Sequence, residues 1–201
     1  MRYPIGVGVF LAVLLATCGF DASANDNAID WRSLQGDKNY SRAVLFYKAG
    51  KYPQAAAAYD KSCESSYAAA CTDLGVMYRL GLGVRRNYKR AAELYQRGCK
   101  GGNALGCTNL GLLYWYAFLP KDYQHAADLF RQGCIGGDGG GCLALGFVYE
   151  KGFGVQKDES RAADLFEQAC VMDKDRGCVK LGAPIEGLLR DATANPPGLG
   201  R

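Results

Sequence analysis

The residues of this chain with the clearest chemical potential are its cysteines, which fall into evenly spaced pairs. Seven residues separate the two members of each pair, and the pairs recur at intervals of 36, 35 and 36 residues. They are Cys63/Cys71, Cys99/Cys107, Cys134/Cys142 and Cys170/Cys178. Cysteines bind metals, form disulfides or act as nucleophiles. Spacing and surroundings must decide between these roles.

Metal binding and redox catalysis both fit the cysteine pattern poorly. Zinc sites normally place two cysteines two to four residues apart or add histidine ligands. The spacing here is wider and His125 is the only histidine, so we predict neither a metal site nor a cofactor. Redox-cycling cysteines are the competing interpretation. One pair in every repeat is, however, typical of structure rather than of catalysis.

The sequence contains no recognisable set of catalytic residues. Serine β-lactamases carry Ser-x-x-Lys together with partner motifs such as Lys-Thr-Gly, and both motifs are absent. His125 is predicted to lie on the outer side of its helix. Carboxylates such as Asp73, Glu93 and Asp164 are scattered over predicted helices without a dedicated pairing. We therefore predict no catalytic residue, and the sequence leaves open whether the protein is an enzyme.

The elements that position the cysteines repeat with the same period. An alanine doublet and an aromatic residue precede each pair, as in Ala91-Ala92 and Tyr95, and Leu-Gly follows it, as in Leu110-Gly111. Offsets of three, four and seven residues trace one face of an α-helix, and no segment alternates as a strand does. A fixed period of this length indicates stacked helix pairs. The chain is therefore predicted to be an all-α solenoid.

Glycines recur where such helices would pack or end. A glycine inside a helix costs about 1 kcal/mol relative to alanine, so the repeated Leu-Gly calls for close helix packing. Gly81-Leu82-Gly83 and Gly152-Phe153-Gly154 lie between the two helices of their units. No strand precedes them and no Lys-Ser/Thr follows, which argues against a phosphate loop. We predict helix stops and turns there.

These motifs together resemble the Sel1-like repeat, a relative of the tetratricopeptide repeat. The unit Leu-Gly-x-x-Tyr-x-x-Gly-x-Gly-Val, followed by Ala-Ala-x-x-Tyr/Phe, covers about residues 40–186. The cysteines narrow the resemblance to secreted bacterial cysteine-rich Sel1-like proteins, some described as penicillin-binding proteins or weak β-lactamases. The resemblance implies about four to five helix-turn-helix pairs. The third connection departs from it, since 116–120 reads Tyr-Ala-Phe-Leu-Pro and lacks Gly-x-Gly.

Each cysteine pair is predicted to form a disulfide within its repeat. The first cysteine falls near the end of one helix and the second near the start of the next, across a short turn. An antiparallel arrangement of these helices brings the two sulfur atoms together. Closing so short a loop stabilises a protein by roughly 2–3 kcal/mol in the loop-entropy model. Such bridges persist in oxidising compartments.

The amino terminus is predicted to direct export. A 12-residue apolar run from Ile5 to Ala16 precedes Ala22-Ser23-Ala24, a pattern typical of a signal peptide over residues 1–24. The run is too short to span a membrane. Cleavage would remove Cys18 and leave eight cysteines. The alternative is a lipoprotein with Cys18 lipidated, and either route makes the protein periplasmic or secreted. We expect a flexible segment at 25–32, the solenoid at 33–190 and a disordered tail at 191–201.

The charge balance excludes a dedicated nucleic-acid surface. The chain has 24 basic and 20 acidic residues, a net charge of +4. Its densest basic cluster, Arg85-Arg86 with Lys89-Arg90, is interpreted as a solvated loop and helix start. Curved helical arrays favour a protein or peptide partner or a peptidoglycan fragment. A β-lactam is the partner that the family resemblance adds, as substrate of a hydrolase. The sequence does not determine the oligomeric state.

Two surfaces are candidates for binding. In tetratricopeptide-like arrays the first helix of each unit lines the concave side, and by that resemblance we predict a binding face. Its predicted members are Asp73, Met77, Asn109, Leu113, Ala144 and Val148. Trp115, Tyr116 and Phe118 cluster at the unusual third connection. They either form an exposed patch for peptide recognition or fill the space left by the missing Gly-x-Gly.

Overall fold

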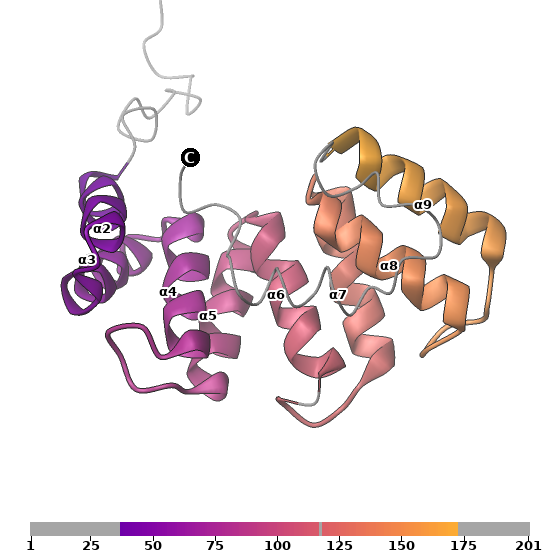
Figure 1. Cartoon of the computed structure of the whole chain (residues 1–201), viewed down its shortest axis with the longest axis horizontal. Helices are drawn as coiled ribbons and strands as arrows, with labels where there is room; N and C mark the ends of the chain where they lie inside the picture. The colour runs from indigo at the N-terminus through magenta and orange to yellow at the C-terminus, as the bar shows by residue number, and fades with distance from the viewer. Residues whose placement is uncertain (1–36, 117, 173–201) are drawn as a thin grey trace, which may run out of the picture. The chain divides into compact units, whose positions relative to one another are not determined.

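The computed structural model describes residues 37–116 and 118–172, and this part of the chain is built from helices alone (Figure 1). The elements are α2 (Lys38–Lys48), α3 (Tyr52–Glu64), α4 (Ala68–Leu80), α5 (Tyr88–Lys100), α6 (Ala104–Trp115), α7 (Tyr123–Ile135), α8 (Gly139–Lys151) and α9 (Glu159–Met172). They form four pairs, in which α2, α4, α6 and α8 are the first helices. The predicted all-α solenoid is confirmed.

Three of the predicted disulfides are present, each joining a second helix to the next first helix. They are Cys63–Cys71, Cys99–Cys107 and Cys134–Cys142, with Cα atoms 4.4 to 4.6 Å apart. The predicted fourth bridge involves Cys178, which lies outside the described residues. We call residues 65–67, 101–103 and 136–138, between the bridged cysteines, the stapled turns.

The three stapled turns share one backbone conformation. Their central residues, Ser66, Gly102 and Gly137, all have positive φ angles of 66°, 88° and 94°. In each turn the residue that follows donates its amide to a carbonyl five residues earlier, at 2.9 to 3.1 Å. This repeated bonding satisfies carbonyls at the end of one helix and starts the next helix at a fixed angle.

The first helices α4, α6 and α8 are the most enclosed elements. Helix α4 packs against both α3 and α5 and also contacts α6, while α6 packs between α5 and α7 and contacts α8. In each Leu-Gly of the described residues, the glycine lies against an aromatic ring from the following helix. A Cβ on Gly75 would lie 2.7 Å from the ring of Tyr95, and one on Gly111 would lie 2.7 Å from Phe130. The predicted close packing is confirmed.

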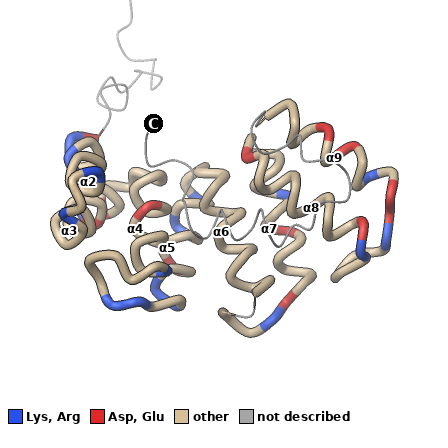
Figure 2. The backbone as a smooth tube through the Cα atoms, viewed as in Figure 1, with Lys and Arg blue, Asp and Glu red and all other residues tan. Residues whose placement is uncertain are grey.

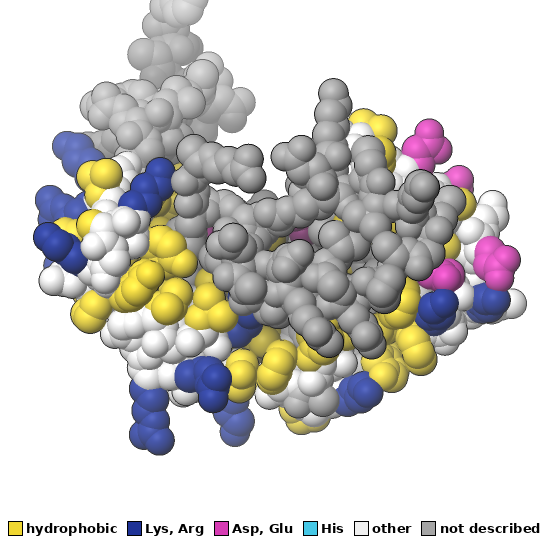
Figure 3. Space-filling model, viewed as in Figure 1, with side chains coloured by type: hydrophobic (Ala, Val, Ile, Leu, Met, Phe, Trp, Pro, Cys, Tyr) yellow, Lys and Arg dark blue, Asp and Glu magenta, His cyan; other side chains and the backbone are white. Residues whose placement is uncertain are grey.

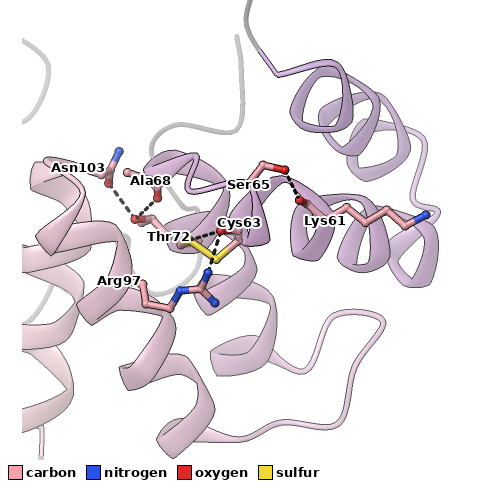
Figure 4. The surroundings of a disulfide bond; sticks show 8 residues. Lys61, Cys63, Ser65, Ala68, Thr72, Arg97 and Asn103 are labelled. Atoms are coloured by element: carbon pink, nitrogen blue, oxygen red, sulfur yellow. Dashed lines mark hydrogen bonds between the residues drawn. A yellow bond between two sulfur atoms is a disulfide. The ribbon is translucent and has the colours of Figure 1, made fainter. Parts of the chain in front are cut away.

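Hydrogen bonds link successive repeats beside the first disulfide (Figure 4). The guanidinium of Arg97 donates from Nη2 to the carbonyl of Cys63 at 2.8 Å. The Thr72 hydroxyl lies 2.9 Å from Oδ1 of Asn103, the same oxygen that accepts the amide of Gly106 at 3.0 Å. The bridged turn is thereby tied to the helix pair that follows it.

At the opposite ends of the helices, four connections join the first helix of each described pair to the second, and those at 81–87 and 152–158 begin with a glycine. Gly81 and Gly152 end α4 and α8 with left-handed φ angles of 76° and 75°, which confirms the predicted helix stops. A Cβ on Gly83 would lie 2.3 Å from the backbone carbon of Tyr52. The connection 81–87 therefore rests directly on the first turn of α3.

The boundaries predicted from sequence reach beyond the described residues. The helices described here run from 38 to 172, inside the predicted repeat region 33–190. Segments 1–24, 25–32 and 191–201 lie outside the described residues. Among the described helices, none combines the length and apolar character needed to cross a bilayer.

Candidate functional site

The six residues predicted to line a concave binding face are buried in the structure. Met77, Leu113, Ala144 and Val148 belong to the hydrophobic clusters between helices, and Asp73 and Asn109 are at most 7% exposed. Helices α4, α6 and α8 each have neighbours on several sides, so the positions that flank their core faces are covered as well. Binding by these residues stays a prediction.

Asp73 is the most unusual residue of that set because its carboxyl group is buried among tyrosines. The side chain accepts a hydrogen bond from the hydroxyl of Tyr40, while its Oδ2 atom has no partner. Burial raises the pKa of Asp73 from 3.8 to about 7, and the bond from Tyr40 opposes that rise. The hydroxyl of Tyr59, close enough to feel the carboxylate, is also buried without a partner.

The surroundings of Asp73 provide hydroxyl groups rather than a second acid or a nucleophile. Burial raises the pKa of Tyr40, and the charge of Asp73 adds to the rise. Tyr95 nearby accepts a hydrogen bond from Nε of Arg79 at 3.2 Å, yet burial raises its pKa to about 12. These tyrosines stay neutral at physiological pH. The cluster is suited to holding a carboxyl group in its protonated form, not to acid–base catalysis at an open site.

An accessible candidate site lies at the other ends of the helices, along the connections within the pairs α4/α5, α6/α7 and α8/α9. The connection 152–158 rests on the start of α7, where a Cβ on Gly154 would lie 2.6 Å from the amide nitrogen of Gln124. Phe118 stacks on Tyr88 at the start of α5. Each of these connections thus contacts the second helix of the preceding pair and leads into the second helix of its own pair. This makes one continuous border, on the lower side of Figure 1.

We call this border the connection edge: residues 81–87, 118–122 and 152–158 with the first turns of α5 and α7. Its apolar part consists of aromatic rings in mutual contact. Phe118, which is 42% exposed, stacks on Tyr88 with ring centroids 4.5 Å apart and an interplanar angle of 16°. Phe153, which is 38% exposed, stacks on Tyr123 at 5.1 Å.

Trp115 packs against both rings of the Phe153–Tyr123 stack. Its ring centroid lies 4.9 Å from that of Tyr123, 5.5 Å from Phe153 and 5.9 Å from Phe147. It also lies 6.2 Å from the buried ring of Phe130. The aromatic cluster was predicted either to fill space or to form an exposed patch, and each interpretation applies to part of it. Trp115, in α6, packs against residues of α7 and α8, whereas Phe118 is exposed.

Basic side chains accompany the rings along the connection edge. Lys121 Nζ lies 4.7 Å from the centroid of Tyr123, and the guanidinium of Arg86 lies 5.9 Å from that of Tyr88, distances suited to cation–π contact. Figure 2 shows the basic run in the connection between α4 and α5, and Figure 3 shows hydrophobic and basic side chains alternating along the lower side of that view. Arg85, Arg86 and Lys89 are exposed, as predicted for a solvated loop.

The acidic groups of the same edge are already engaged. Asp122 and Asp158 cap helices by accepting the amides of His125 and Arg161, each at 2.9 Å. Two further carboxylates form ion pairs, Glu150 with Lys151 at 2.9 Å and Glu159 with Lys157 at 2.6 Å. The excess of positive charge on the edge therefore lies at Arg85, Arg86 and Lys89, beside the stack of Phe118 on Tyr88.

Sequence reasoning found Trp115, Tyr116 and Phe118 but missed Phe153 and the tyrosines that support the stacks. A signal was present. Leu82, Phe118 and Phe153 occupy the same offset from the second cysteine of their repeats, and Tyr52, Tyr88 and Tyr123 all begin second helices. The described residues contain no group of three or more potential metal ligands.

Comparison with known proteins identifies the repeat. The family model described as "Sel1 repeat" matches residues 68–103, 104–138 and 140–170, which together make up half of the chain. Each matched segment spans a first helix and the second helix that follows it. No curated protein matches the chain in sequence.

Solved structures similar to this chain come from several bacteria. A Sel1 repeat protein from Oxalobacter formigenes is 26% identical, with a TM-score of 0.65 over 70% of this chain and 57% of that one. The protective antigen c5321 of uropathogenic Escherichia coli, with an SLR fold, is 26% identical, with a TM-score of 0.63 over 72% of this chain and 32% of that one. Cysteine-rich protein B of Helicobacter pylori is 25% identical, with a TM-score of 0.49 over 71% and 96%. The chain thus spans 57% and 32% of the lengths of the first two proteins.

Proposed function

Because the chain belongs to the Sel1 repeat family, we propose that it is an exported scaffold that binds a protein or peptide along its connection edge. Repeats of this kind build protein-interaction scaffolds, and they do so by stacking rigid helix pairs that expose one continuous surface. The observation that carries the proposal is the exposure of Phe118 and Phe153 on that edge. Aromatic and arginine side chains that stay accessible on a rigid frame are typical of protein interfaces.

Support for export comes from the disulfides and from the amino-terminal sequence. Bridges that repeat through the core persist in oxidising compartments and are rare in reducing ones. The described bridges are 63–71, 99–107 and 134–142. The predicted signal peptide at 1–24, with its Ala-x-Ala site, would bring the chain to such a compartment.

The β-lactam alternative gains no support from the described residues. The perturbed carboxyl group of Asp73 is buried among hydroxyls, and no serine of the chain is followed by lysine at the third position. We therefore carry the binding function forward and leave hydrolysis aside. For the same reason we do not propose a β-lactam as a partner.

Site-specific photocrosslinking in the exporting cell tests the proposal. A photoreactive phenylalanine analogue replaces Phe118 in one variant and Leu45, an exposed apolar residue of α2, in a matched control. We expect a protein adduct from position 118 that position 45 does not give. The crosslinked protein, once identified and purified, should bind the oxidised scaffold in solution. Adducts of equal yield at both positions, or no binding in solution, would contradict the proposal.

A further inference from the structure

We infer that the partner segment recognised by the connection edge is an acidic peptide that also carries aromatic or other apolar side chains. This inference rests on the proposed function and specifies the chemistry of its partner. It combines two properties of the same surface, the free cations and the half-exposed rings.

The edge carries more positive than negative charge, and the excess lies at Arg85, Arg86 and Lys89. Arg85, Lys89 and Lys121 have no ion pair among the described residues. Asp122 and Asp158 cap helices and keep their charge, and Asp158 also pairs with Arg161 at 3.1 Å. The edge therefore attracts negative charge and repels basic segments. In an exposed setting this charge arrangement mainly selects partners and accelerates their encounter.

The rings add an apolar contact that charge alone does not provide. One face of Phe118 lies on Tyr88 and one face of Phe153 lies on Tyr123, so each ring is held rigidly and still offers area to a partner. Rigid aromatic groups lose little conformational entropy on binding. An aromatic side chain packs well against the edge of such a stack.

Family membership favours a peptide over an acidic polysaccharide, because repeats of this kind build protein-interaction scaffolds. A peptide side chain can pack against the exposed part of each ring, while acidic residues before or after it reach Arg85 or Lys121. A sugar ring could stack on the same exposed area, since a scaffold tyrosine covers one face of each ring. An acidic glycan is therefore the competing occupant that the test must distinguish.

A random copolymer of glutamate and tyrosine is a direct probe for this chemistry. Its affinity for the oxidised full chain is measured by fluorescence anisotropy and compared with polyglutamate, a lysine–tyrosine copolymer and polygalacturonate. We expect the glutamate–tyrosine copolymer to bind at least tenfold more tightly than each of the other three. We also expect its affinity to fall as salt is raised, because the attraction of exposed charges is screened.

Two double variants separate the contributions, and each has a control made of exposed residues outside the edge. Phe118→Ser with Phe153→Ser removes the rings, and Leu45→Ser with Ile135→Ser removes apolar groups that are more exposed, at 68% and 81% against 42% and 38%. Arg85→Gln with Lys121→Gln removes charge, and Lys61→Gln with Lys100→Gln does so on exposed positions near the stapled turns. Each edge variant should weaken copolymer binding at least tenfold, and each control less than twofold.

Several results would overturn the inference. Equal binding of polyglutamate would mean that the rings add nothing, and tighter binding of polygalacturonate would assign the edge to glycans. Equal losses in edge and control variants would place binding elsewhere. If the copolymer fails to bind while a purified crosslinked partner still binds through position 118, the acidic peptide is wrong and the proposed function stands.

Discussion

The two ends of the helix pairs differ in how strongly they constrain the chain. At one end, the stapled turns repeat with the same length, the same positive-φ centre and a disulfide in each described copy. At the other end, the connections have no disulfide. Of the four, two begin with a glycine that ends the preceding helix, Gly81 and Gly152, and the short connection 49–51 contains Gly50 with a positive φ. The remaining one contains Phe118, which stacks on Tyr88.

This difference separates stability from recognition. Cross-links and repeated turns fix the spacing and angle of successive pairs, so the other end can vary its side chains without loss of the fold. Loops that vary on a rigid scaffold are where binding residues are usually found. The comparison predicts that changes near the stapled turns alter unfolding, and that changes on the connection edge alter binding.

The largest effect is expected at Asp73, two residues after a bridged cysteine. Its pKa in the folded protein is about 7, against 3.8 as the ordinary value. Between about pH 4 and pH 7 the unfolded chain has released this proton while the folded chain retains it, so stability falls as pH rises. Asp73→Asn should therefore raise the free energy of unfolding at pH 8 by up to about 4 kcal/mol, and far less at pH 4.

Urea unfolding of Asp73→Asn and of the parent at pH 4 and pH 8 measures this difference. Asp164→Asn, on the exposed surface of α9, is the matched control and should change little. A variant less stable than the parent at pH 8 would show that Asp73 is ionised and favourably paired. The buried carboxyl group of Asp73 would then stabilise the fold at pH 8 instead of destabilising it.

The next largest effect concerns a single bridge. Replacing Cys99 and Cys107 together with alanine should lower the free energy of unfolding by roughly 2–3 kcal/mol, because the unfolded chain regains the freedom of the closed loop. The loss should be greatest for the repeats beside the missing bridge, since each repeat contacts mainly its neighbours. Urea unfolding with amide exchange locates it. An unchanged unfolding curve would mean that stacking alone stabilises the array.

A smaller effect distinguishes the three stapled turns from one another. Ser66 is the one described residue other than glycine with a positive φ, at 66°, where the other turns have Gly102 and Gly137. A non-glycine residue with a left-handed backbone destabilises the folded state by roughly 1–2 kcal/mol. Replacing it with glycine removes this strain but also raises the conformational entropy of the unfolded chain, which offsets part of the gain. Ser66→Gly should thus stabilise by about 0.5 kcal/mol. Gly102→Ser should destabilise by a similar amount, and a gain from Gly102→Ser would refute the shared geometry.

The smallest change in stability is expected on the connection edge. Arg85→Gln with Lys121→Gln should shift the free energy of unfolding by less than about 0.5 kcal/mol, as exposed substitutions normally do. Thermal and urea unfolding of the purified variants check this. A loss of 2 kcal/mol or more, roughly the value of a bridge, would mean that these cations support the fold and would remove the contrast between the two ends.

The stapled end could be predicted from sequence because its determinants are local. Eight-residue cysteine separations, small residues and glycines fix the turn within a few positions of the chain. The burial of Met77 and Leu113 could not be read from helical periodicity, since it depends on how many neighbouring helices surround α4 and α6. The same tertiary packing places Tyr40 and Tyr59 around Asp73 and shifts its pKa.

The connection edge was predicted only in part for a related reason. Trp115 and Phe118 stood out because the third connection breaks the repeat, but Phe153 sits inside a regular Gly-x-Gly motif and gave no such break. The stacking of Phe118 on Tyr88 joins residues of different repeats. Offsets within one unit do not reveal that contact.

Amide hydrogen exchange on the oxidised protein, with and without saturating glutamate–tyrosine copolymer, tests the separation of the two ends most directly. The account predicts slower exchange at residues 81–87, 118–122 and 152–158 on binding, and unchanged exchange at the stapled turns 65–67, 101–103 and 136–138. Protection confined to the stapled turns or to the first helices α4, α6 and α8, with the connections unaffected, would contradict it.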